Sequence, residues 1–293
     1  VDFDCDDWRG LWQALADIVA HWIDQGVRVF RVDNPHTKPI RFWQWLLERV
    51  RAEHPDVIFL AEAFTKPAVM YQLGKIGFHQ SYTYFTWRNG AQELGEYVQE
   101  LAGPPVNRFF RPNFFANTPD ILHEYLQTGG EPAFRARLVL AATLSPSYGI
   151  YSGFENLEDT PVRPGSEEYE DSEKYTVKSR DLDGPLLPLF ADLNAIRRRL
   201  PALRRIDPFH VLVTQNDALM AYAKGHGSDA VITVVTLDTT ARQVGLVELT
   251  HEVGLPDAFP VVDHLTAGIY DWRTGGNYVA LEPGQAHILG VRR

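Results

Sequence analysis

The sequence predicts an α/β protein whose parallel sheet is followed by a smaller antiparallel β domain. Up to about residue 200, short apolar strands alternate with amphipathic helices through short connections, which indicates a parallel sheet covered by helices. After about residue 207, short strands follow one another with Gly, Pro and Asp between them, which is typical of an antiparallel sandwich. We therefore predict two domains, residues 1–207 and residues 208–293.

The first domain is predicted from helical periodicity and from short runs of β-branched and aromatic residues. Gly26 stands where a helix C-cap is expected, and Pro39 is suited to the start of the second helix. Helices are expected at residues 8–25, 40–54, 67–75, 90–101, 131–144 and 186–200, and buried strands at 27–32, 57–61, 80–86, 107–115 and 148–152.

Five strand–helix units are too few to close a (β/α)8 barrel, the TIM-barrel architecture. Because the chain begins with Val1 rather than Met, we expect it to be the C-terminal portion of such a barrel, with three strands missing. We also expect that this fragment alone neither closes a barrel nor turns over substrate. Residues 158–184 are charged and contain Pro and Gly, which predicts a long loop, and loops of this length are usually either functional or disordered.

The second domain is predicted from short apolar runs at fairly regular spacing. Strands are expected at residues 211–214, 219–223, 230–236, 243–247 and 286–291.

Composition narrows the possible partners and the compartment. The formal net charge of −10 argues against nucleic acid or an anionic membrane as a partner. A single cysteine, Cys5, allows no internal disulfide, and no apolar run approaches the length of a membrane span. These features predict a cytoplasmic protein. His36 and His123 have no further ligands at metal-binding spacing, so no metal or cofactor is expected.

Three carboxylates follow predicted strands: Asp33, Glu62 and Asp120. Because Asp33 and Glu62 are one strand–helix unit apart, they should lie at the ends of neighbouring strands, where barrel enzymes carry their chemistry. Retaining glycoside chemistry needs such a close pair, one nucleophile and one acid. Whichever of Arg28 and Arg31 points inward should keep Asp33 ionised, and Arg31 shares its face of the strand. Glu62, in apolar surroundings, should keep its proton near neutral pH.

The residues around these carboxylates resemble the α-amylase superfamily, glycoside hydrolase family 13. Residues 30–34 (Phe-Arg-Val-Asp-Asn) and 59–63 (Phe-Leu-Ala-Glu-Ala) resemble its nucleophile and acid/base motifs. Residues 114–120 (Phe-Phe-Ala-Asn-Thr-Pro-Asp) resemble its third carboxylate motif. The three motifs occur in the family's order at the expected strands.

Within the superfamily, the resemblance is to the bacterial α-1,4-glucan:maltose-1-phosphate maltosyltransferases. It is carried by residues 31–39, 111–120 and 148–155 and by the pair Lys174-Tyr175, and it extends over residues 5–200. A typical amylase has His where this chain has Pro119. That departure favours the transferases over a generic hydrolase.

The resemblance implies a role for each residue. Asp33 would be the nucleophile, Glu62 the acid/base and Asp120 the stabiliser of the distorted sugar ring.

The resemblance also implies which residues bind the donor. Lys174, Tyr175 and Asn34 would receive the phosphate of α-maltose 1-phosphate, and an α-1,4-glucan would be the acceptor. The family is also expected to form homodimers.

Two alternatives stay open at this point. An α-1,4-glucan hydrolase differs from the transferase in how water is excluded from the acceptor subsite, which the sequence shows poorly. The other alternative is a catalytically inactive glucan-binding module. An aromatic run from Tyr82 to Trp87 fits either core packing or a sugar platform.

Overall fold

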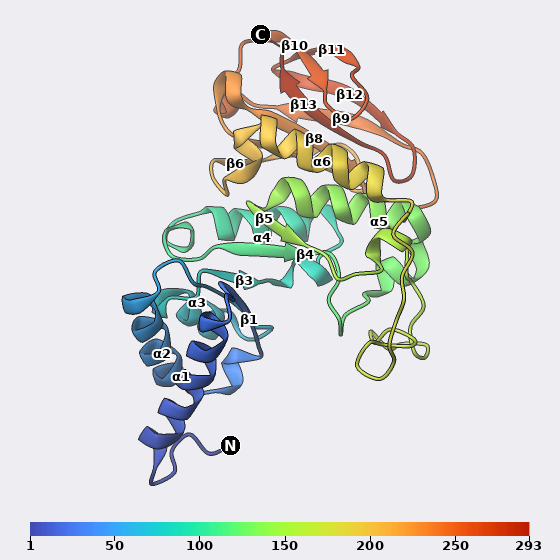
Figure 1. Cartoon of the computed structure of the whole chain (residues 1–293). Helices are drawn as coiled ribbons and strands as arrows, with labels where there is room; N and C mark the ends of the chain where they lie inside the picture. Colours follow the sequence, from blue (N-terminus) through green and yellow to red (C-terminus); the bar gives the residue numbers. More distant parts are fainter. Residues whose placement is uncertain (293) are drawn as a thin grey trace. The chain divides into compact units, whose positions relative to one another are not determined.

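The computed structural model describes residues 1–292, which form two compact units (Figure 1). The first contains residues 1–83 and 105–113, and the second contains residues 84–104 and the chain from Phe114 onward. Every helix among residues 1–292 is either too short or too polar to cross a membrane.

The parallel sheet has five strands in the order β1-β2-β3-β4-β5, which is also their order along the chain. Sequential neighbours with helices in the connections are the arrangement of successive β/α units. The strands are β1 (Val29–Asp33), β2 (Ile58–Glu62), β3 (Gln80–Tyr82), β4 (Pro112–Phe115) and β5 (Ser147–Gly149). The predicted alternation of strand and helix is therefore confirmed.

The core of the first unit lies between its strands and its helices. The helices are α1 (Trp8–Asp24), α2 (Ile40–Glu53) and α3 (Pro67–Ile76). In α1 and α2, apolar residues recur at helical spacing, and their buried faces meet in one cluster that includes Trp12, Phe42, Leu46 and Phe59. This cluster supports the apolar side of β1 and β2, whose final residues are Asp33 and Glu62.

β1 is not the buried strand that the sequence predicts. Its exposure alternates, and Val29 is 54% exposed, whereas Phe30 and Val32 pack against the core. The core cluster covers the face of β1 that carries Phe30 and Val32, and the opposite face is left exposed among the described residues.

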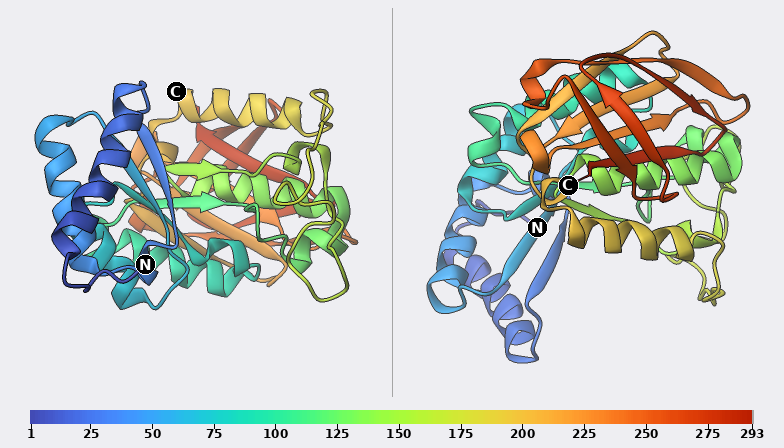
Figure 2. Two further views of the ribbon diagram at one scale, coloured as in Figure 1. Left: turned by 60° about the horizontal axis from the view of Figure 1, so that its bottom comes forward. Right: turned by 90° about the horizontal axis from the view of Figure 1, so that it is seen from above.

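The second unit contains the helices α4 (Ala91–Ala102), α5 (Glu124–Leu144) and α6 (Leu187–Arg199) (Figure 2). Residues 133–144 of α5 are almost all buried, and the helix contacts α6, β5 and β8 (Val231–Thr236). Gly130 has a positive φ of 57° and Pro132 follows it, which breaks α5 near residue 131, where the sequence predicts the helix to begin.

The antiparallel sheet has eight strands in the order β11-β10-β13-β8-β7-β6-β9-β12. Its apolar core includes Leu212, Ile232, Val247, Val261 and Leu289. The further strands are β6 (Phe209–Thr214), β7 (Leu219–Lys224), β9 (Gln243–Leu249), β10 (Ala258–Asp263), β11 (Ile269–Arg273), β12 (Gly275–Leu281) and β13 (Ala286–Val291).

Five of these eight strands match predicted ones, and β10, β11 and β12 were not predicted. Pro260 stands inside β10, β11 carries Asp271 and Arg273, and β12 begins with two glycines. These residues weaken the sequence signal for a strand. The strands form nevertheless, because pairing with neighbouring strands stabilises them where intrinsic β-propensity is low.

Several strands of the parallel sheet are shorter than predicted, and the difference is greatest for β3 and β4. After β3 the chain turns into the 3-10 helix η2 (Tyr84–Trp87), and a 3-10 helix at Val106–Arg108 replaces the start of the strand predicted from residue 107. Pro105, which directly precedes this 3-10 helix, has φ −88° and ψ −2°, so the chain is already turning where the sequence predicts a strand. The loop predicted at 158–184 contains no helix or strand, only an isolated bridge between Pro161 and Tyr169.

Candidate active site

In the first unit, Asp33 and Glu62 end the neighbouring strands β1 and β2 at paired positions. Parallel neighbours lie about 4.8 Å apart, so the two side chains emerge side by side. Both carboxyl groups form ion pairs with the same guanidinium, that of Arg31. Such proximity suits a retaining pair, because an inverting pair needs room for a water between the carboxyls.

The two carboxyls differ strongly in exposure. The Glu62 side chain is 4% exposed and that of Asp33 is 64% exposed. Burial, and then the hydrogen bond with Asp33, raise the pKa of Glu62, and the nearby Arg31 charge lowers it; together these effects bring the pKa to about 7. Glu62 can therefore exchange a proton near neutral pH, as a general acid and base must.

Arg31 lies beside both carboxyls. Its Nη1 is 3.5 Å from Asp33 Oδ1, and its Nη2 forms a closer ion pair with Glu62 Oε2. The guanidinium also stands over the Tyr82 ring, 6.0 Å from its centroid. The alternative left open in the sequence is thus resolved, because Arg28 pairs with Asp56 instead. Tyr82 is buried.

Asn34 continues directly from Asp33 in the left-handed conformation, with φ 46°. Asparagine adopts this conformation more readily than most residues. Its Nδ2 donates to Asp33 Oδ1 over 3.4 Å, and its carbonyl accepts from Thr37 Oγ1 at 2.8 Å. The turn holds the Asn34 amide next to the Asp33 carboxylate.

In the second unit, Asp120 and Lys174 form an ion pair. Lys174 Nζ also lies 3.4 Å from Glu168 Oε1, and the hydrogen bond with Asp120 raises the pKa of Lys174. Thr118 and Ile121 are bridged on either side of Asp120, and Thr118 Oγ1 accepts from the Asp120 backbone N–H at 3.2 Å. Lys174 reaches Asp120 from the long loop, 54 residues later in the chain.

Tyr175, the other residue of the predicted pair, is 81% exposed, and its backbone N–H donates to the Ser172 carbonyl at 2.9 Å. The structure thus brings Arg31, Asp33, Asn34 and Glu62 together in the first unit. It brings Asp120 and Lys174 together in the second unit.

Sequence reasoning missed a polar network in the loop of the second unit. It consists of Tyr151, Glu158, Glu173 and Arg180. The run of charged residues from 167 to 174 gave no signal for it, because such runs are usually solvated.

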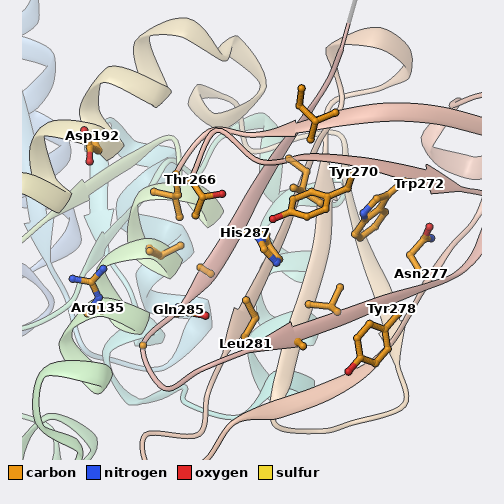
Figure 3. A pocket seen from close by; sticks show the side chains of 18 of the residues that line it. Arg135, Asp192, Thr266, Tyr270, Trp272, Asn277, Tyr278, Leu281, Gln285 and His287 are labelled. Carbon is orange, nitrogen blue, oxygen red and sulfur yellow. The ribbon is translucent and has the colours of Figure 1, made fainter.

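A cavity of about 1240 Å³ lies in the second unit, lined by the sandwich and by α5 and α6 (Figure 3). Tyr270, Tyr278 and His287 face it from β11, β12 and β13, and Arg135 and Asp192 face it from the two helices. None of the predicted site residues lines this cavity. Residues 1–292 contain no group of three or more His, Cys, Asp and Glu side chains arranged to hold a metal ion.

Solved structures define the class of fold. The chain matches an α-amylase from Geobacillus thermoleovorans with a TM-score of 0.77, at 14% identity, over 99% of this chain and 65% of that one. An Anoxybacillus α-amylase matches with a TM-score of 0.75, at 17% identity, over 98% of this chain and 64% of that one. The fold is therefore that of part of an α-amylase, a TIM-barrel segment with an antiparallel sandwich, as the sequence predicts.

Sequence comparison is more specific. Residues 211–291 match the family described as GLGE, C-terminal. The whole chain is 54% identical to alpha-1,4-glucan:maltose-1-phosphate maltosyltransferase 2 of Streptomyces coelicolor and spans 45% of its length. It is 47% identical to the maltosyltransferase of Mycolicibacterium smegmatis, over 99% of this chain and 43% of that protein. By sequence, the chain is a homologue of these maltosyltransferases and covers less than half of their length.

Proposed function

We propose that the full-length protein carrying this chain transfers maltosyl units from α-maltose 1-phosphate to the non-reducing end of α-1,4-glucans. The observation that carries the proposal is the pairing of Asp33 with a buried Glu62 whose pKa is raised to about 7. It is supported by relatives that are 44–54% identical along this chain and are named as maltosyltransferases of this kind.

In the first step, an Asp33 carboxylate oxygen attacks the anomeric carbon, and the bond from that carbon to the phosphate oxygen breaks. Glu62 gives its proton to the departing phosphate, and a β-maltosyl ester forms on Asp33. Exposure leaves Asp33 accessible to the sugar, and burial keeps Glu62 protonated until it is needed.

In the second step, the 4-hydroxyl of the glucan attacks the same carbon. Glu62, now a carboxylate, accepts the hydroxyl proton, and the bond to Asp33 breaks. Two inversions give net retention. Arg31 stabilises the carboxylate forms of both residues, because its guanidinium lies against each of them.

We assign Asp120 to the sugar hydroxyls and the distorted ring of the transition state. Lys174, Tyr175 and Asn34 bind the phosphate. The Lys174 ammonium, which pairs with Asp120, stands on a side chain that is 38% exposed, and this exposure supports the assignment.

The proposal also covers the domain boundaries, the oligomeric state and the cellular location. We infer a catalytic barrel segment at 1–207 and a sandwich domain at 208–293, a homodimer and a cytoplasmic location. The single cysteine and the absence, among residues 1–292, of a membrane-crossing helix are compatible with that location.

The test supplies the full-length protein with α-maltose 1-phosphate and a maltooligosaccharide and measures inorganic phosphate and product length. Phosphate release with products longer by two glucose units is expected, and Asp33→Ala should abolish both. New reducing ends from glucan alone, without phosphate, would identify a hydrolase. No reaction with either substrate would leave a glucan-binding module and overturn the proposal.

A further inference from the structure

We propose that Tyr151, Glu158, Glu173 and Arg180, here called the loop latch, are positioning residues that hold Lys174 where it meets the phosphate of the donor. The inference rests on the proposed function and adds to it the residues that fix the anion-binding loop.

Arg180 is the centre of the latch. Its side chain is 11% exposed and lies between two carboxylates. Nε donates to Glu158 Oε1 at 2.9 Å, and Nη1 donates to Glu173 Oε1 at 2.6 Å. A largely buried guanidinium with two charged acceptors is held in one orientation, because its donors form a rigid fork.

Tyr151 joins the latch to the segment that carries Asp120. Its hydroxyl donates to Glu173 Oε2 at 2.5 Å, and its backbone N–H donates to Asn117 Oδ1 at 2.8 Å. Asn117 is fully buried and lies three residues before Asp120. One residue therefore links both partners of the Asp120–Lys174 pair to the same framework.

Glu173 precedes Lys174 in the chain, so their α carbons are about 3.8 Å apart. Fixing the Glu173 carboxylate from two sides therefore fixes the backbone from which Lys174 reaches Asp120. The hydrogen bond from Tyr151 and then those from Arg180 lower the pKa of Glu173, which keeps it an anion.

Residues 158–184 form no helix or strand, so their backbone makes few regular hydrogen bonds. The loop is attached separately at Glu167. Glu167 accepts from Trp87 Nε1 at 2.9 Å, and its carbonyl accepts from the Leu122 N–H at 2.7 Å. The loop latch holds the later segment of the loop, which contains Lys174.

The test uses the full-length protein with Arg180→Met, Arg180→Lys and Glu173→Gln. The control is Arg163→Met, which changes an exposed arginine of the same loop whose side chain forms no ion pair within residues 1–292. The measurements are KM for α-maltose 1-phosphate, KM for the maltooligosaccharide and inhibition by inorganic phosphate.

Arg180→Met and Glu173→Gln should raise the donor KM about tenfold and weaken phosphate inhibition in parallel, with the acceptor KM within about twofold of wild type. Arg180→Lys should recover part of the loss, and Arg163→Met should change nothing. An unchanged donor KM, or equal losses for donor and acceptor, would overturn the positioning role.

Failure of the proposed function has a different signature. In that case the wild type itself releases no phosphate from the donor, and the positioning role is overturned with the function. Limited proteolysis of the loop, compared between wild type and Arg180→Met, then shows separately whether the latch orders residues 158–184.

Discussion

The pKa of Glu62 makes a quantitative prediction for the pH dependence of the transfer reaction. A pKa of about 7 instead of 4.5 leaves about half of the Glu62 carboxyls protonated at pH 7. With the usual value, only roughly 1 in 300 would be protonated. Because the first step needs the acid form, kcat/KM for α-maltose 1-phosphate should fall about tenfold for each pH unit above about 7.

The balance of effects that sets the pKa of Glu62 can be tested by removing the charge of Arg31. Its charge lowers the pKa of Glu62, whereas burial and the hydrogen bond with Asp33 raise it. Arg31→Gln should therefore move the falling limb of the kcat/KM profile to higher pH, whatever it does to the absolute rate. Phosphate release measured from pH about 5 to about 9.5 gives both profiles. A wild-type limb near pH 5, or a limb that moves to lower pH in Arg31→Gln, would refute this account of the pair.

Two further predictions concern stability in the full-length protein. Gly153 has φ 100°, and a Cβ there would lie 2.4 Å from the Glu158 carboxyl. Gly153→Ala should therefore destabilise the folded conformation of the loop by about 1–3 kcal/mol and speed its proteolysis. Gly165→Ala, with a positive φ but open space, is the control and should have the smaller effect; equal effects would contradict the contact with Glu158. Lys224 is fully buried and donates to the Leu144 and Leu203 carbonyls, and burial holds its pKa well below 10.5. Since the unfolded state then binds more protons, the melting temperature of wild type relative to Lys224→Met should rise with pH up to about 10.5, and a constant difference would contradict it.

The sequence predicts the parallel sheet well because each unit carries its own signals. The helices beginning near Trp8 and Ile40 have strong apolar periodicity and a recognisable cap, and β2 is a compact apolar run that ends in Glu62. β10 to β12 were missed because their stability comes from neighbours across the sheet, which a single sequence does not show.

For the site, the sequence predicts the catalytic pair but not the side-chain contacts around it. Asp33 and Glu62 follow from strand ends one unit apart, and their pairing in the sheet agrees with that expectation. The preference of Arg31 for Glu62, and the contacts of Glu173 with Tyr151 and Arg180, depend on side-chain directions in three dimensions. Sequence spacing carries no information about contacts of this kind.

The central claim is that Asp33 becomes covalently attached to the sugar, while Glu62 acts first as the general acid and then as the general base. The direct measurement is the intact mass of the full-length Glu62→Gln protein after exposure to α-maltose 1-phosphate. The amide of the Glu62→Gln variant can still donate a hydrogen bond to the departing phosphate, so the first step is slowed, but it cannot accept the proton of an acceptor hydroxyl. The ester should therefore form slowly and accumulate in this variant. The account predicts a gain of one maltosyl unit, located on Asp33 by peptide mapping. An unmodified protein that still releases phosphate, or a maltosyl group on another residue, would contradict it.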